Sequence, residues 1–376
     1  MTERKRRMPA EWEHQSCVQL TWPHKDTDWA PILPEITAVY EEMAREISKR
    51  EGLLIVAPKA LQSILSPQIS NLKPQTSNLL PFTSNDTWAR DHGFITVVEG
   101  SALHLLDFSF NGWGEKFPAE LDNQINRRLY DQGLVKGTYE DHLDFVLEGG
   151  SIESDGKGTI FTTSCCLMAP HRNQPLTQQQ IEDRLKAYLG AERVVWINHG
   201  SLIGDDTDGH IDTLVRICPN DTLLYIGGDD DHPDLTAMEE ELRELRTLDG
   251  KPYRLLKLPM PRPVYSSQFI VHSSQLNDAQ PNYESSQLND AQPNYELCTM
   301  NYELTDRLPA TYANYLVING AVLVPTYAQP DLDAEAMRII GQAFPDREIV
   351  GIDCRAVIRQ HGSLHCCTMQ YYFDNG

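Results

Sequence analysis

The sequence predicts an α/β protein, because helical segments and strand-like runs follow one another along the chain. Five segments carry apolar residues at the spacing of one helix face, and each is followed by an apolar run of four to six residues. Regular alternation of the two kinds of segment is the pattern of an α/β fold. Five similar modules also favour a closed, repeating arrangement, although no sequence repeat covers whole modules.

The expected helices are identified by their apolar stripes. They span 34–50, 118–131, 177–189, 235–248 and 331–344. The third of them also has Thr177 in the place of an N-cap and Gly190 as a stop signal. The runs that follow the helices are Leu53–Ala57, Leu143–Leu147, Val194–Ile197, Tyr253–Leu258 and Glu348–Ile352. Further strand-like runs are Phe94–Val98, Thr159–Thr163, Ile211–Ile217, Thr222–Ile226, Tyr315–Ile318 and Ala321–Pro325.

The charge balance limits the class of partner. The 376 residues include 54 acidic and 32 basic side chains, which gives a formal net charge of −22. A nucleic-acid groove needs a basic face, so this balance argues against a nucleic-acid partner and favours a small cationic substrate. No stretch of 18 apolar residues is present, so we expect no membrane span.

The termini and cysteines favour the cytoplasm. The basic start, residues 1–7, leads into Pro9 and Glu11 without an apolar stretch, so we expect no signal peptide. The eight cysteines include the adjacent pairs Cys165-Cys166 and Cys366-Cys367, and their spacing matches neither a disulfide framework nor a zinc motif. A reduced, cytoplasmic enzyme is the expectation, and assembly with further copies of the chain stays open.

One literal repeat interrupts the modules. Ser273–Glu284 and Ser285–Glu296 have the same twelve letters, SSQLNDAQPNYE, and they are polar without helical or strand period. Surface loops tolerate such insertions at little cost in free energy. We therefore expect one catalytic domain over 1–376 with a polar insertion loop at about 264–304, which either has no chemical role or covers a substrate or subunit contact.

Four segments are too polar to be ordinary strand ends. They are Asn85–Asp91, Leu147–Gly150, Gly204–Asp212 and His361–Thr368. Loops that follow strands are where active sites collect on α/β scaffolds. Carboxylates beside a cysteine raise its pKa, so this combination suits catalysis only if the substrate brings a positive charge. A guanidinium fits, because it is planar, cationic and pairs with carboxylates through forked hydrogen bonds.

The acidic run allows other interpretations. If Gly209–Ile217 is a strand, His210 and Asp212 point to the same face, where one could move protons while the other holds substrate. A solvated acidic loop would have the same composition. A calcium loop of the EF-hand type is a weaker match because the required order of acids is lacking, and zinc lacks a paired Cys or His motif.

These segments, with others in the same order, carry a resemblance to a known family. In chain order, the motifs that carry the resemblance are Arg7–Glu13, Thr21–Pro23, Asp86–Asp91, Leu147–Ser151, Asp208–Asp212, Arg307–Tyr312 and His365-Cys366. Together the motifs resemble the agmatine deiminase and bacterial peptidyl-arginine deiminase family of the guanidine-modifying superfamily. They run from residue 7 to 370, so the resemblance covers nearly the whole chain.

The resemblance implies a fold and a set of roles. The fold is the pentein α/β propeller, five ββαβ modules with fivefold pseudo-symmetry. In that family Cys366 matches the nucleophile, His210 the general acid and base, and Asp91 and Asp212 the carboxylates that hold the guanidinium. Glu148 matches the acid that orients the histidine and substrate. Trp88 matches an aromatic residue near the mouth of the pocket. Neither a cofactor nor a metal is implied.

The leading hypothesis is a hydrolase that converts agmatine to N-carbamoylputrescine and ammonia through a covalent thiouronium on Cys366. The acidic chain favours a substrate with two positive charges. Deimination of arginine or of peptidyl-arginine, with a citrulline product, remains an alternative. Transfer of the amidino group to an amine is a further alternative, because that reaction would use the same residues. An acidic metal-binding module, formed by Asp205, Asp206, Asp208 and Asp212, is an alternative from a different class, as is an interaction protein without catalysis.

Overall fold

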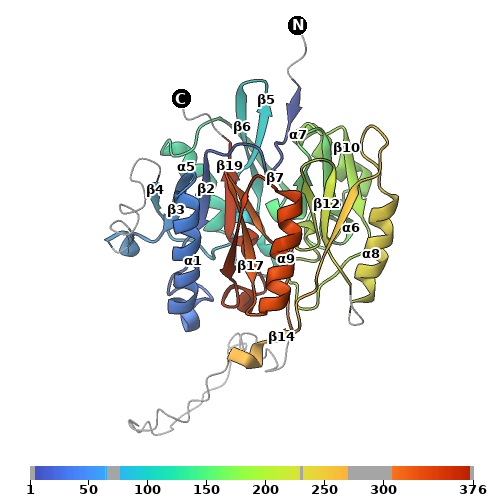
Figure 1. Cartoon of the computed structure of the whole chain (residues 1–376). Helices are drawn as coiled ribbons and strands as arrows, with labels where there is room; N and C mark the ends of the chain where they lie inside the picture. The colour runs from blue at the N-terminus through green and yellow to red at the C-terminus, as the bar shows by residue number, and fades with distance from the viewer. Residues whose placement is uncertain (1–4, 64, 66–76, 229–231, 270–306, 373–376) are drawn as a thin grey trace, which may run out of the picture.

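The computed structural model describes residues 5–63, 65, 77–228, 232–269 and 307–372. It has the expected α/β architecture, with the long helices on the outside of a set of small sheets (Figure 1). The repeated segment 273–296 lies outside the described residues. None of the helices within the described ranges is long and apolar enough to cross a membrane.

One structural unit recurs five times in the described residues: an antiparallel strand pair, an outer helix and a third, parallel strand. The first unit contains β19 (Thr368–Tyr371), β2 (Cys17–Thr21), α1 (Leu33–Ser48) and β3 (Gly52–Ala57), with β4 (Ser77–Pro81) added at the edge. The second contains β5 (Ile95–Glu99), β6 (Ala102–Ser109), α5 (Ile125–Asp131) and β7 (Thr138–Val146), with β1 (Arg6–Arg7) at its edge.

The other three units follow in chain order. The third contains β8 (Ile152–Ser154), β9 (Thr159–Thr163), α7 (Gln178–Leu189) and β10 (Arg193–Ile197). The fourth contains β11 (Val215–Cys218), β12 (Thr222–Ile226), α8 (Pro233–Glu244) and β13 (Arg254–Leu258). The fifth contains β16 (Leu316–Ile318), β17 (Ala321–Thr326), α9 (Pro330–Ala343) and β18 (Glu348–Asp353). Between the last two lies a ribbon of β14 (Val264–Tyr265) and β15 (Arg307–Leu308).

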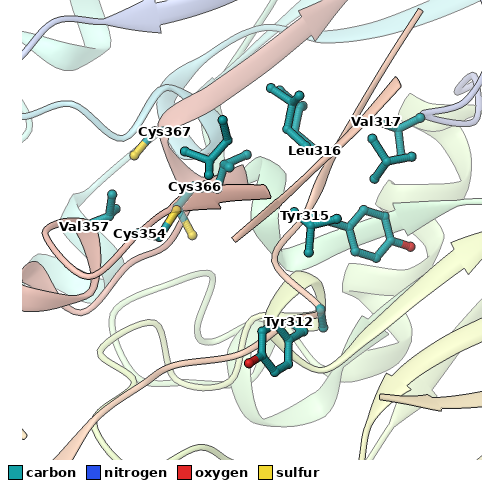
Figure 2. Close-up of a cluster of buried hydrophobic side chains, with 14 of the residues drawn as sticks. Tyr312, Tyr315, Leu316, Val317, Cys354, Val357, Cys366 and Cys367 are labelled. Atoms are coloured by element: carbon teal, nitrogen blue, oxygen red, sulfur yellow. The ribbon is translucent and has the colours of Figure 1, made fainter. Parts of the chain in front are cut away.

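The two ends of the chain meet in the first unit. Its antiparallel pair combines β19 from the C-terminal end with β2 from the N-terminal end, with Thr368 opposite Leu20. A hydrophobic core then runs between the units, because the central strands β3, β12 and β17 are apolar on both faces and the helices cover them. Figure 2 shows part of this core, with Cys354, Cys366 and Cys367 on one side and the ring of Tyr315 directed away from them.

The local signals of the sequence explain the helix boundaries. Thr177 caps α7 in a capping box with Gln180, and Gly190 ends it in the left-handed conformation at φ 68°, as expected. The expected helix 118–131 is shorter, because only Ile125–Asp131 is α-helical. Ahead of it, Asn85 and the buried Asp122 exchange hydrogen bonds with one another's backbone, and these contacts hold the segment in a turn.

Two strand predictions need correction. The run 211–217 begins as a 3-10 helix, η5 (Ile211–Thr213), and only the later part is strand β11. His210 and Asp212 are therefore not placed by strand alternation. Strand alternation would also place the adjacent thiols of Cys366 and Cys367 on opposite faces, but both residues lie in a 3-10 helix, η8 (His365–Cys367). Strands β2, β6 and β19 were not expected, because polar residues interrupt their apolar patterns.

Candidate active site

The polar segments of the sequence converge at the loops that lead into the first strand of each unit. Asp91 belongs to α3 (Ala89–His92), which precedes β5, and Glu148 stands before β8. His210 and Asp212 flank the start of η5, ahead of β11, and Cys366 lies in η8, ahead of β19. Because the five units repeat one pattern, these equivalent loops bring together residues that are far apart in sequence.

A pocket opens onto this group. Cys366, Asp91 and Trp88 line it, and its empty space, with the open solvent at its mouth included, measures about 480 Å³. Trp113 and Phe117 add an aromatic wall, with Trp113 edge-on to the ring of Trp88 at 6.3 Å between centroids. The other residues that line the pocket are Asp28, Asp86, Asp206, Thr207, Gln360, His361 and Gly362. The described lining thus has carboxylates and aromatic rings but no lysine or arginine.

Asp91 is held at both of its oxygens. Trp113 donates to Oδ2 from its indole nitrogen at 2.9 Å, and the backbone N–H of Gly150 donates to Oδ1 at 3.0 Å. His210 Nδ1 lies 3.7 Å from the same Oδ1. Burial raises the pKa of Asp91, although the neighbouring His210 opposes that shift.

Gly150 marks the point where three of these side chains meet. A Cβ atom placed there would lie 2.5 Å from Nδ1 of His210, 2.9 Å from Oδ1 of Asp91 and 3.1 Å from Oδ2 of Asp212. Side-chain contacts this short do not occur, so only glycine lets the three polar groups close on one another. The Gly149-Gly150 pair after Glu148 therefore reflects packing against the site.

Cys366 is buried, and its thiol is held in one orientation. Its Sγ donates to Oδ1 of Asn314 at 3.4 Å, and the same oxygen accepts the backbone N–H of His365 at 2.9 Å. Burial, together with the nearby carboxylates of Asp212 and Asp91, raises the pKa of Cys366 well above its ordinary value. In the free protein the thiol is thus neutral at pH 7.

The neighbouring thiol is in a different environment. Cys367 donates to the backbone oxygen of Ser363 at 3.5 Å and does not line the pocket. Burial raises its pKa to about 12, and Tyr40 is its polar neighbour. Only Cys366 of the pair therefore lines the pocket.

Glu148 lies beside His210 and does not line the pocket. It is fully buried, and Arg172 donates to its Oε1 from Nε at 2.8 Å. Its Oε2 has no hydrogen-bond partner within the described structure. Arg172 also donates to Asp208 at 2.8 Å, so one guanidinium joins Glu148 to the acidic segment.

Asp212 connects the pocket to a second buried group. Nδ1 of His365 lies 2.7 Å from its Oδ2, and Nε2 of His365 lies 2.9 Å from Oε2 of Glu11. Burial alone would raise the pKa of Asp212, but the hydrogen bond with His365 and the electrostatic attraction of His365, His210 and Arg216 together outweigh burial and lower the pKa. Oδ1 of Asp212 has no partner in the described structure.

The second buried group is organised by Arg216. This side chain is almost wholly buried and donates to Glu11 and Glu153, each at 2.5 Å. It also donates to the backbone oxygens of Ala313 and Tyr315. The Arg216 guanidinium and His365 hold the pKa of Glu11 well below its usual range, although burial opposes them. The group thus supports Asp212 from behind.

Four of the buried polar atoms that lack a hydrogen bond in the described structure belong to the site. Both ring nitrogens of His210, Oδ1 of Asp212 and Oε2 of Glu148 are buried without a hydrogen-bond partner among the described residues. Burial opposes a positive charge on His210, yet Asp91, Cys166 and Glu148 together raise its pKa well above 6.5. Buried polar groups of this kind cost free energy unless a ligand completes them. A planar cation with several N–H donors would do so.

The structure brings together all six residues that the sequence singled out: Trp88, Asp91, Glu148, His210, Asp212 and Cys366. The sequence reasoning missed the supporting residues, which are Glu11, Trp113, Arg172, Arg216, Asn314 and His365. One signal was available: Arg216 interrupts the apolar run 211–217, and a charge inside a buried strand requires a buried partner.

The acidic run does not form a carboxylate cluster for a metal ion. Asp205 accepts hydrogen bonds from Thr207 and the backbone of Gly209, both at 2.7 Å. Asp208 pairs with Lys116 and Arg172, each at 2.8 Å. These acids fold the loop that carries His210, which argues against the acidic metal-binding module.

Comparison with known proteins covers nearly the entire chain. Residues 7–371 match the family model of the Porphyromonas-type peptidyl-arginine deiminases. The agmatine deiminase of Pseudomonas aeruginosa (strain LESB58) is 31% identical over 97% of this chain and 95% of its own. A solved structure from Porphyromonas gingivalis is 44% identical, covers 98% of each chain and has a TM-score of 0.81.

A further solved structure is the agmatine deiminase of C. jejuni, in a Cys-to-Ser form with substrate bound. It is 34% identical, covers 98% of this chain and 96% of its own, and has a TM-score of 0.80. The match of the family model over residues 7–371, supported by relatives of full length, settles the assignment: the chain belongs to the Porphyromonas-type peptidyl-arginine deiminase family.

Proposed function

We propose that the protein is an agmatine deiminase, which hydrolyses the guanidinium of agmatine to N-carbamoylputrescine and ammonia. The observation that carries the proposal is the pocket that joins Cys366 to Asp91, with His210 and Asp212 meeting at Gly150. Relatives of similar length are agmatine deiminases. Asp91 and Asp212 hold the guanidinium, and Glu148 orients His210 and the substrate. Trp88 forms part of the pocket wall.

The electrostatics of the free site suggest how the nucleophile is activated. Burial, together with Asp212 and Asp91, keeps the Cys366 thiol neutral, and the same carboxylates attract the guanidinium. A bound cation offsets their charge, so the thiol loses its proton to solvent only when substrate is present. The thiolate then attacks the guanidinium carbon.

His210 then serves as acid and as base. Because its pKa is raised, the imidazole of His210 is protonated and donates the proton that converts the departing amino group to ammonia. The departure of ammonia leaves a thiouronium on Cys366. The neutral imidazole next takes a proton from water, and the resulting hydroxide attacks the same carbon. Collapse of that adduct breaks the carbon–sulfur bond, releases the ureido product and restores the thiolate. The remaining proton leaves with ammonia.

The outer part of the pocket favours agmatine over arginine. Asp28, Asp86 and Asp206 line it together with aromatic rings, and the described lining has no lysine or arginine. The amine of agmatine would be attracted by these carboxylates, whereas the α-carboxylate of arginine would be repelled. Deimination of free or peptidyl arginine is therefore the second candidate.

The fold and the cellular setting belong to the same proposal. The five repeated units form one catalytic domain and are arranged around a common axis as an α/β propeller, in which equivalent loops supply Asp91, Glu148, His210 and Cys366. The seven cysteines in the described ranges are all free, in keeping with a reducing cytoplasm. The protein acts on a small cationic guanidinium, without nucleic acid or membrane as a partner.

The test is a direct comparison of substrates. Purified protein is incubated with agmatine, arginine and an arginyl peptide, and the ureido product and ammonia are measured. We expect agmatine to give the highest kcat/KM. Asp206→Asn is the matched variant, because loss of one outer carboxylate should lower the ratio of agmatine to arginine turnover. Preference for arginine would overturn the substrate assignment, and no turnover of any of the three would overturn the activity.

A further inference from the structure

A second cysteine lies against the site without a role in the proposed reaction. Cys166 is fully buried in α6 (Ser164–Leu167), the short helix that follows β9. Thr163 accepts its backbone N–H at 3.2 Å and donates to the backbone oxygen of Gly209 at 2.6 Å. This link fixes α6 beside the segment that carries His210.

Three potential metal ligands meet here. One imidazole nitrogen of His210, one carboxylate oxygen of Glu148 and the thiol sulfur of Cys166 all lie within 4.8 Å of one another. Zinc bonds to such atoms measure about 2.0–2.3 Å, so a tetrahedral ion places its ligand atoms about 3.3–3.8 Å apart. An inward movement of about 1 Å is enough to close the set.

Two of the three residues have atoms that no conventional hydrogen bond completes, although His210 and Cys166 interact with one another. Both ring nitrogens of His210 and Oε2 of Glu148 are buried without a hydrogen bond in the described structure. Arg172 donates to Oε1 of Glu148, so Oε2 is the oxygen that remains for a ligand shared with His210 and Cys166. Orphaned buried atoms on two of the three residues are an independent sign that a ligand fits here.

We propose that Glu148, Cys166 and His210 form an inhibitory Zn²⁺ site. A thiolate with an imidazole and a carboxylate favours zinc over magnesium or calcium, which prefer oxygen ligands alone. The ion takes three protein ligands and keeps a fourth position for water, and the proton of the thiol leaves to solvent. Since the ligands come from three separate segments, no spacing motif in the sequence reveals the site.

The three ligands lie behind the wall of the substrate pocket. Asp91 lines the pocket, and its Oδ1 lies 3.7 Å from Nδ1 of His210. A histidine bound to zinc cannot carry the proton that the departing ammonia needs, and a bound Glu148 cannot orient it. Inhibition thus rests on the proposed function, whereas binding of the ion does not.

Binding is tested with Co²⁺ as a spectroscopic probe in the Cys366→Ser protein, which lacks the other pocket thiol. We expect one equivalent of Co²⁺ to produce thiolate-to-cobalt charge-transfer absorption, and Zn²⁺ to abolish it by displacement. Adding Cys166→Ser should remove the absorption. Adding Cys165→Ser is the matched control and should keep it, because that neighbouring thiol is exposed.

Inhibition is tested separately in the protein with Cys366 intact. Zn²⁺ should inhibit turnover reversibly, with recovery on chelation, and Cys166→Ser should raise the inhibitory midpoint at least about tenfold. Cys166→Ala serves if the serine variant loses its fold. X-ray absorption of the zinc-loaded Cys366→Ser protein needs no change at position 166 and should show one sulfur ligand.

Two results would overturn the site. One is cobalt absorption of equal strength in the Cys166→Ser, Cys366→Ser protein, and the other is failure of the Cys366→Ser protein to bind Co²⁺ or Zn²⁺. Either decides the matter whatever the substrate assays give, because neither measurement uses turnover.

Discussion

The two sides of Asp212 use the same kinds of residue in opposite ways. Behind it, Glu11, Glu153, Arg216 and His365 form a buried group in which each charged side chain has partners. In front of it, His210 and Oδ1 of Asp212 itself lack partners in the described structure. A satisfied group fixes positions, and an unsatisfied one is ready to bind. The difference separates the residues that hold the site from those that meet a substrate.

The largest effect expected on the pocket side comes from Cys366→Ser. An alcohol is far less ionised than a thiol, even with a bound cation, so turnover of agmatine should fall by at least about a thousandfold. The melting temperature should change little, because the substitution keeps the shape. Steady-state kinetics and thermal unfolding measure the two effects.

Cys367→Ser is the control for that substitution. Its thiol bonds to the backbone of Ser363 outside the pocket, so most of the activity should remain. The opposite pattern, with Cys367→Ser inactive and Cys366→Ser active, would place the nucleophile one residue later.

The next largest effect is expected behind Asp212, and on stability. Glu11→Gln leaves the buried guanidinium of Arg216 with one carboxylate fewer, and breaking a buried ion pair costs about 3–5 kcal/mol. Urea unfolding should show that loss in the free energy of unfolding. Asp131→Asn removes an exposed pair with Arg127, which solvent screens, and should leave the free energy of unfolding almost unchanged. Equal costs would mean that the buried group does not hold the fold.

The comparison also shows what could be predicted from sequence. Asp91, His210 and Cys366 could be found because they lie in polar, turn-rich segments whose composition is hard to explain otherwise. Glu11 and His365 lie inside motifs that were recognised, yet their role depends on contacts across more than 350 residues, which spacing along the chain cannot show.

The errors in the fold have a similar physical origin. The alternation over 209–217 predicts a strand, but Thr213 donates to the backbone oxygen of His210 and closes a 3-10 turn instead. Strand β19 was not expected, since its pairing partner β2 lies at the other end of the chain. The helices were predicted best, because caps such as Thr177 and Gly190 act within a few residues.

A smaller effect on the pocket side is expected from Asp91→Asn and Asp212→Asn. Each removes one charge from the pair that holds the guanidinium, and a charge-assisted hydrogen bond is worth about 1.5–3 kcal/mol. The kcat/KM for agmatine should therefore fall by about ten- to a hundredfold. The stability of Asp212→Asn should fall as well, because His365 loses its charged partner. Near-normal kcat/KM in both variants would contradict the proposal that Asp91 and Asp212 bind the guanidinium.

The smallest effect concerns the pH dependence at the outer pocket. Burial and the neighbouring Asp28 raise the pKa of Asp86 to about 7. Its carboxyl is therefore mostly neutral at pH 6 and mostly anionic at pH 8, and only the anion attracts the amine of agmatine. Between these values kcat/KM should rise with pH, by at most about tenfold from this group.

The matched measurement separates Asp86 from the catalytic groups that titrate in the same range. Asp86→Asn should lower kcat/KM at pH 8 and flatten the rise between pH 6 and 8. A simple alkylguanidine, which lacks the second amine, should show no such difference between the parent and Asp86→Asn. If the alkylguanidine loses as much as agmatine, Asp86 acts on the reacting end through its contacts with Trp29 and Thr87, and the charge of the outer pocket does not select the dication.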